Sequence, residues 1–132
     1  MGAGRATDLA LGELRTRLAL IDRSLVLSLV AREEAQREIL TLKRASSLPL
    51  VDREREREVR RRARAWAREF GGDPDLAAHV LQAALESGKR RFFRAGGTPL
   101  AGAHAAALLF QDPEIAPRSR PRDGPRIPVL VG

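Results

Sequence analysis

The first third of the chain has one uninterrupted amphipathic pattern. Between residues 8 and 45 there is no proline, and apolar residues recur at spacings of three and four, as on one face of an α-helix. The stripe consists of Leu11, Leu14, Leu18, Ile21, Leu25 and Leu29. At about 1.5 Å per residue this helix would exceed roughly 50 Å, whereas a small domain is about 30 Å across. The pattern therefore predicts one long helix whose stripe needs a second subunit to cover it.

A second helix is predicted after a short connection that contains a proline. Asp52 is a good N-cap for a helix over residues 53–70, which ends at the glycine pair 71–72. Its apolar face, which we expect in the core, consists of Val59, Ala63, Trp66 and Phe70.

A third helix is predicted from Pro74 to about residue 94. Asp73 and Pro74 suit its N-cap and first residue, and a glycine pair follows its end. Its inward face consists of Leu76, Val80, Leu81 and Leu85, whereas His79 is expected at the surface or in a packing role.

The composition changes after residue 96 to glycine, proline and alanine. A short helix is possible over residues 101–110, and the proline- and arginine-rich segment APRSRPRDGPR follows. Residues 127–132 (IPVLVG) have the pattern of a buried strand, with no room left for the sheet that it would need. We therefore assign residues 1–95 to a helical domain and residues 96–132 to a flexible tail or linker.

Length and composition limit the class of protein. A chain of 132 residues fits one small domain with an extension. The absence of cysteine excludes disulfides, thiolate ligands and a cysteine nucleophile, and fits a reducing compartment. The two histidines are far apart, so no metal site is predicted. No apolar run approaches the roughly 20 residues that span a bilayer, and no signal peptide is recognisable, so a cytoplasmic protein without a membrane partner is predicted.

The net charge of +7 fits nucleic acid, an anionic surface or a small polyanionic substrate. Four phenylalanines and one tryptophan are not interleaved with a basic stripe, as a base-stacking surface would require. The arginines at 57, 60, 61, 62, 64 and 68 are expected to form a solvated helix face with glutamate partners. A nucleic-acid partner is therefore not favoured, although a basic helical dimer that binds nucleic acid remains the alternative from another class.

Three cations of the first helix can be placed by helical geometry. Arg32 and Lys43 are 11 residues apart, about three turns and only about 20° of rotation, so they project from one face and can converge on one ligand. Arg15 lies 17 residues before Arg32, about 100° away. It cannot easily join that cluster from its own chain, whereas the copy on a partner chain could.

Further polar residues begin the second helix and end the third. Asp52, Arg55 and Glu56 open the second helix, where free backbone N–H groups can meet a polar ligand. Ser87 and Arg91 are four residues apart and share a face of the third helix. Any one of these charges is more often a solvated surface residue, but their combination favours a site for a small anion.

The ordered motifs resemble the AroQ-type chorismate mutases across about residues 9–91. They are LRTRLALID at residues 14–22, Arg32 eleven residues before Lys43, PLVDRERE at residues 49–56, and Ser87. The resemblance implies an all-α chain of three helices with a long first helix, in an intertwined homodimer. It also implies that the protein rearranges chorismate to prephenate in phenylalanine and tyrosine biosynthesis, without a cofactor or metal.

Five residues take substrate-binding roles by this resemblance. Arg15 would reach across the dimer to one substrate carboxylate, and Arg32 would bind the other within its own subunit. Asp52 would hold the ring hydroxyl. Arg55 would support the anionic end and order the glutamate beside it, and Ser87 would assist a carboxylate.

The resemblance gives catalytic roles to Lys43, Glu56 and Arg91. Lys43 would contact the ether oxygen, where a point charge stabilises the negative charge that grows as the bond breaks. Glu56 would hold the ring hydroxyl with Asp52. Related enzymes usually have Gln or Glu at the position of Arg91, where that side chain contacts the same ether oxygen. A cation there could serve this purpose, or it could repel Lys43.

Two further alternatives remain at this point. Isochorismate pyruvate lyases and aminodeoxychorismate mutases share the fold and the Arg and Lys framework, although Glu56 and the long connection after the first helix favour chorismate. The segment RIPVLVG also resembles the first strand of the prephenate dehydrogenase found fused to some family members. The chain is then either the mutase half of such a fusion, without the glycine-rich turn that binds NAD, or it ends in a tail without that role.

Overall fold

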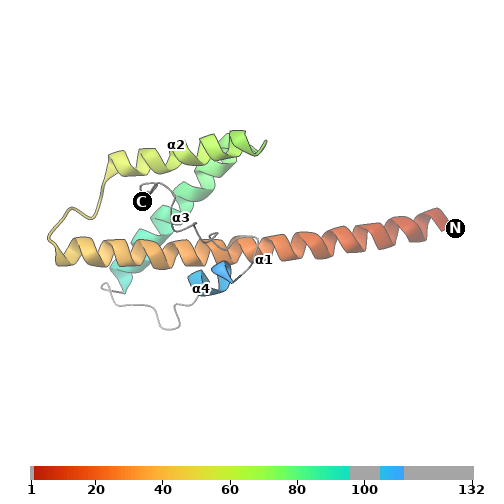
Figure 1. Cartoon of the computed structure of the whole chain (residues 1–132), viewed down its shortest axis with the longest axis horizontal. Helices are drawn as coiled ribbons and strands as arrows, with labels where there is room; N and C mark the ends of the chain where they lie inside the picture. Colours follow the sequence, from red (N-terminus) through yellow and green to blue (C-terminus); the bar gives the residue numbers. More distant parts are fainter. Residues whose placement is uncertain (1, 96–104, 112–132) are drawn as a thin grey trace, which may run out of the picture. The chain divides into compact units, whose positions relative to one another are not determined.

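The computed structural model describes residues 2–95 and 105–111, and these residues are helical apart from short connections. The helices are α1 (Gly2–Ala45), α2 (Arg53–Glu69), α3 (Pro74–Arg94) and α4 (Ala105–Phe110), as Figure 1 shows. This confirms the predicted all-α class and the long first helix, which begins at Gly2, six residues earlier than expected. None of the helices in the described ranges is long and apolar enough to cross a membrane.

The short helix expected over residues 101–110 is present as α4, from residue 105 onward. The arginine- and proline-rich segment and the strand expected at residues 127–132 lie outside the described residues. The division into a helical domain and a tail therefore stays a prediction.

Side-chain caps fix where α2 and α3 begin. Asp52 Oδ1 accepts a hydrogen bond of 3.0 Å from the Arg55 backbone N–H. Asp73 Oδ1 accepts from the backbone N–H groups of Asp75 and Leu76, at 2.9 and 3.2 Å, and Pro74 occupies the first turn of α3. Each aspartate satisfies donors that have no partner inside the helix. The caps predicted from sequence are confirmed.

The ends of α1 and α2 share one backbone motif. After α1, Leu48 N–H donates to Lys43 O at 2.8 Å and Ser47 N–H to Arg44 O at 3.2 Å, with Ser47 at φ 55°. After α2, Gly72 N–H donates to Ala67 O at 2.7 Å, and Gly71 has φ 76°. Both are Schellman-type ends, in which the residue in the left-handed conformation is usually glycine.

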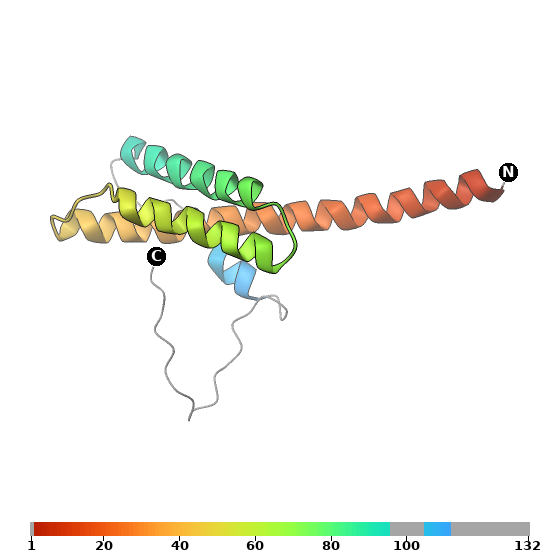
Figure 2. The same cartoon turned by 90° about the horizontal axis from the view of Figure 1, so that it is seen from above.

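The chain forms two compact units, which divide α1. The first unit contains α1 as far as Arg32 and also α4. The second contains the last part of α1, from Glu33, together with α2 and α3. Within the second unit, α2 and α3 lie side by side on either side of a short turn (Figure 2).

The core of the second unit is small. Its buried apolar residues are Leu40, Val59, Ala63, Ala78, Leu85 and Phe92. Phe92 is 0% exposed, and the guanidinium carbons of Arg44 and Arg37 lie 4.6 and 5.9 Å from the centroid of its ring. These cation–π contacts attach the end of α1 to α3.

Gln36 of α1 packs against α3 at Gly88. Gln36 Nε2 donates to Leu85 O at 2.9 Å, and a Cβ at Gly88 would overlap Gln36 Oε1. A larger residue at position 88 would therefore have to displace the Gln36 side chain.

Three residues predicted to face the core are exposed, so this part of the prediction is wrong. Trp66, Phe70 and Leu76 are 49%, 80% and 60% exposed. They lie near the turn between α2 and α3. There the ends of α2 and α3 cover only the side of each helix that faces the other. Val59 and Ala63 of the same α2 face are buried, and His79 is exposed as expected.

The apolar stripe of α1 is also exposed in the single chain. Leu11, Leu14, Leu18, Ile21 and Leu25 are between 41% and 56% exposed, and only Leu29 of the stripe is half-buried. This agrees with the expectation that one chain cannot cover the stripe.

Candidate active site

The predicted site residues lie on three helices. Arg15, Arg32 and Lys43 belong to α1; Asp52, Arg55 and Glu56 belong to the start of α2 and its cap; Ser87 and Arg91 belong to the second half of α3. Arg15 and Arg32 are in the first compact unit and the other six are in the second. Geometry between side chains is therefore described for the second unit.

Arg32 and Lys43 are both half-buried on α1. The helix is continuous through both residues, so the rotation of about 20° that places them on one face applies. Burial lowers the pKa of the Arg32 guanidinium below its ordinary value, because desolvation disfavours the charged form. An arginine still remains protonated at physiological pH. It is a partly desolvated cation, and a bound anion would compensate for the lost hydration.

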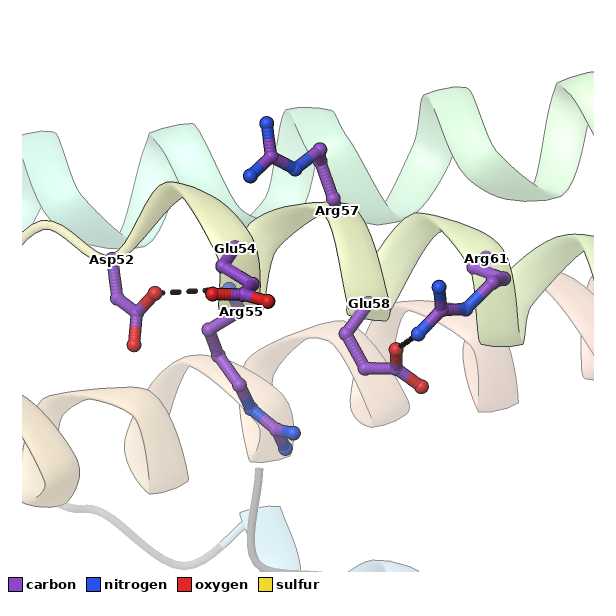
Figure 3. Close-up of a pocket in the computed structure, with 6 residues that line it drawn as sticks. All are labelled: Asp52, Glu54, Arg55, Arg57, Glu58 and Arg61. Atoms are coloured by element: carbon purple, nitrogen blue, oxygen red, sulfur yellow. Dashed lines mark hydrogen bonds and ion pairs between the residues drawn. The ribbon is translucent and has the colours of Figure 1, made fainter.

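Asp52 and Arg55 stand at the first turn of α2. Asp52 is exposed and its carboxylate caps the helix through Arg55 N–H, the dashed line in Figure 3. Arg55 and Arg57 leave α2 on opposite sides in this view, and Arg55 is half-buried whereas Arg57 is exposed. At the same turn, Glu56 N–H donates to Asp52 O at 3.1 Å, so a backbone hydrogen bond also joins two of the predicted site residues.

A hollow of about 410 Å³ lies beside this turn. Its lining is Asp52, Glu54, Arg55, Arg57, Glu58 and Arg61, drawn in Figure 3. All six residues belong to the beginning of α2, so the hollow is a space between neighbouring side chains of one helix. Glu58 and Arg61 form an ion pair across one turn. Only two of the predicted residues line it, and we do not identify this hollow with the substrate site.

Glu56 is paired with a lysine that the sequence analysis did not identify. Lys89 Nζ lies 2.5 Å from Glu56 Oε1, and the two side chains are 21% and 18% exposed. Ser87 and Lys89 are two residues apart on α3, about 200° of rotation. The Glu56 carboxylate therefore meets a different side of α3 from the one that presents Ser87. No local signal could have found this pair, because 33 positions separate its members.

Arg91 also has a partner that was not predicted. Its Nη1 donates to Glu33 Oε2 at 2.7 Å. The Arg91 side chain is 50% exposed and that of Glu33 14%. Ser87, four residues earlier on α3, is half-buried.

In the arginine-rich part of α2, one arginine has a glutamate partner on its own helix, as expected, whereas two others have partners on α3, which was not expected. Arg61 pairs with Glu58, Arg64 lies 3.4 Å from Asp75 of α3, and Arg60 donates to Gln82 Oε1 at 2.6 Å. These side chains are engaged within the chain. In the described part, no group of three or more His, Cys, Asp or Glu residues could hold a metal ion.

A comparison with protein families identifies the family of this chain. The model of the family described as chorismate mutase type II matches residues 14–91, which is more than half of the chain. The chain belongs to this family. The matched segment begins one residue before Arg15 and ends at Arg91, so it includes all eight predicted site residues. No curated protein and no solved structure matches the chain.

Proposed function

We propose that the protein is a chorismate mutase that rearranges chorismate to prephenate. The observation behind this proposal is that the segment matched by the family contains the expected cations and carboxylates in the expected order, with Arg91 in place of the usual Gln or Glu. The rearrangement breaks one C–O bond and forms one C–C bond within a single molecule, with no proton transfer. Catalysis then consists of positioning and electrostatic stabilisation.

The two carboxylates of the substrate are bound by guanidinium groups. Arg32 takes one of them, and its partly desolvated charge supports this role because a buried cation binds an anion more strongly than an exposed one. Bidentate hydrogen bonds suit this contact. The other carboxylate is bound by the partner subunit's Arg15. Together they hold the enolpyruvyl arm over the ring, and Ser87 adds a hydrogen bond.

Lys43 stabilises the ether oxygen as the C–O bond breaks. It is half-buried and shares the helical face of Arg32, which places its ammonium beside a substrate bound by that arginine. A fixed cation in a partly dry site favours the transition state, in which this oxygen becomes negative, over the ground state.

The ring hydroxyl is held by the acidic residues that begin α2. Glu56 is already oriented by its ion pair with Lys89, and Asp52 by its capping bond. Arg55, between them in sequence and half-buried, adds positive charge on this side. Pre-oriented acceptors lower the entropy that substrate binding would otherwise cost.

The active form is a homodimer with two shared sites. The exposed apolar stripe of α1 supports this, because a monomer would leave a row of leucines in water. A second copy of the same helix would bury the row and bring its Arg15 to the site.

Incubating the purified protein with chorismate, and separately with isochorismate, tests the function. Products identified by NMR distinguish the reactions: prephenate from chorismate is expected, and salicylate with pyruvate from isochorismate would indicate a lyase. Aminodeoxychorismate is the third substrate to test. Turnover of none of these compounds, in a folded protein, would contradict the proposal.

A further inference from the structure

We propose that Glu33 is the positioning residue of Arg91, and that the two side chains act in the site as one ion pair without net charge. This inference rests on the proposed function. It names a residue of α1 for which neither the motifs nor the family resemblance suggested a role.

The geometry of the pair is well defined. Glu33 and Arg91 belong to the same compact unit, and their bond of 2.7 Å has the length of a charge-assisted hydrogen bond. Glu33 is much the more buried partner, with 14% of its side chain exposed against 50% for Arg91. Separating a mostly buried carboxylate from its cation is energetically costly, because an uncompensated charge is left in the protein interior.

The second oxygen of Glu33 strengthens this preference. Glu33 Oε1 is buried and has no hydrogen-bond partner in the described part of the chain. The identified hydrogen bond of this carboxylate is the one that Oε2 accepts from Arg91. The buried Glu33 carboxylate therefore restrains the direction in which the Arg91 guanidinium points.

Arg91 keeps donors for a ligand. A guanidinium has five N–H donors, and one of them is used by Glu33. Because half of the Arg91 side chain is open to solvent, the remaining donors can bind an oxygen of the substrate. Glu33 fixes one edge of the guanidinium and leaves the other edge available.

The pair also resolves the charge conflict at this position. The family resemblance implies that Lys43 and the residue at position 91 reach the same ether oxygen, where two cations would repel each other. Glu33 adds one negative charge at 2.7 Å from the Arg91 guanidinium, so the pair is neutral as a whole. The pair therefore repels Lys43 less than a lone cation would, and Arg91 keeps N–H donors for the ether oxygen.

A double-mutant cycle tests the inference. The variants are Glu33→Gln, Arg91→Gln and the double variant, with kcat and KM for chorismate measured for each. Each single variant loses at least about fivefold in kcat/KM, because one charge of the pair is left alone. The double variant, which restores a neutral amide at position 91, recovers to within about threefold of the wild type. Glu33→Asp, which keeps the charge, retains more activity than Glu33→Gln.

The ion pair of Arg64 with Asp75 is the matched control. It also joins α3 to another helix, but its side chains are 39% and 89% exposed. The cycle of Arg64→Gln and Asp75→Asn should leave kcat and KM unchanged. Thermal unfolding of all variants is measured in parallel, since a purely structural ion pair would show coupling in stability alone.

The outcomes separate the two proposals. Wild-type turnover with single-variant losses that multiply in the double variant would overturn the role of Glu33 and leave the proposed function intact. Coupling in unfolding without coupling in kcat would do the same. A wild-type protein that does not convert chorismate would contradict the proposed function, and the role of Glu33 would fall with it.

Discussion

At the scale of single residues, the burial of Arg32 favours the binding of an anion but costs folding free energy. Burial lowers its pKa because the folded state disfavours the charged form. The unfolded chain therefore binds this proton more tightly than the folded chain. The cost to folding is present at every pH at which Arg32 is protonated in the folded chain, and it is relieved only as the pH rises through the lowered pKa toward the ordinary pKa of arginine. The cost consequently does not change with pH in the physiological range.

Replacing Arg32 with methionine should separate the two properties. We expect the free energy of unfolding, measured in urea, to change by no more than about 1 kcal/mol, because the substitution removes the desolvation cost of the cation together with the interaction that Arg32 makes in the fold. Activity on chorismate should fall at least about a hundredfold. Arg57→Met, at an exposed position of α2, is the control that should affect neither property. A clear loss of stability in Arg32→Met would show that the guanidinium stabilises the fold.

Lys43 and Arg44 are adjacent cations with different expected roles. Lys43→Ala should reduce kcat by about a hundredfold to a thousandfold, in line with the loss of one preorganised charge contact, and leave the fold intact. Arg44→Ala should instead lower the unfolding temperature, because its guanidinium lies 4.6 Å from the centre of the buried Phe92 ring. Stopped-flow or NMR turnover and thermal unfolding measure both effects. Near-normal turnover of Lys43→Ala would refute its role at the ether oxygen.

At the scale of elements, what the sequence predicted depends on how far apart the interacting residues are. The beginnings of α2 and α3 were predicted correctly because Asp52 and Asp73 cap backbone groups within three residues. The burial of Trp66 was predicted wrongly, because it depends on which neighbouring helix covers the end of α2. The pairs of Glu56 with Lys89 and of Glu33 with Arg91 could not be predicted for the same reason: only packing brings such distant positions together.

At the two Schellman-type helix ends, substitutions at equivalent positions are predicted to change the free energy of unfolding in opposite directions. Ser47 adopts φ 55° and Gly71 φ 76°, a region that costs a residue with a Cβ about 1 kcal/mol. Ser47→Gly should therefore raise the free energy of unfolding by about 0.5 kcal/mol, after allowance for the greater freedom of glycine in the unfolded chain. Gly71→Ala should lower it by about 1 kcal/mol. Urea unfolding of both variants measures the difference, and changes of equal sign would contradict this account of the helix ends.

At the scale of the whole molecule, a single chain does not bury the apolar stripe that its sequence places on α1. The stripe of α1 has the spacing of a buried helix face, yet Leu14 and Leu18 are 53% and 56% exposed. In the proposed homodimer, two copies of this face would pack against each other, as in an isologous dimer. Arg15 lies beside Leu14 on the same exposed part of α1, where a partner chain would place it near a second copy of Arg32.

Mixing two inactive variants tests this shared site. In a hybrid dimer of Arg15→Ala and Arg32→Ala subunits, one site contains both substitutions and the other contains neither. Equal mixing with free subunit exchange should therefore restore about a quarter of the wild-type activity, since about half of the dimers are hybrids with one intact site each. Arg32→Ala mixed with Lys43→Ala is the control. Both residues act within their own subunit, so every site in that mixture lacks one of them and no activity should return. Exchange is followed by mass spectrometry of differently tagged subunits. Recovery in the first mixture alone would place Arg15 in its partner's site, whereas no recovery despite complete exchange would mean that each chain binds chorismate with its own residues.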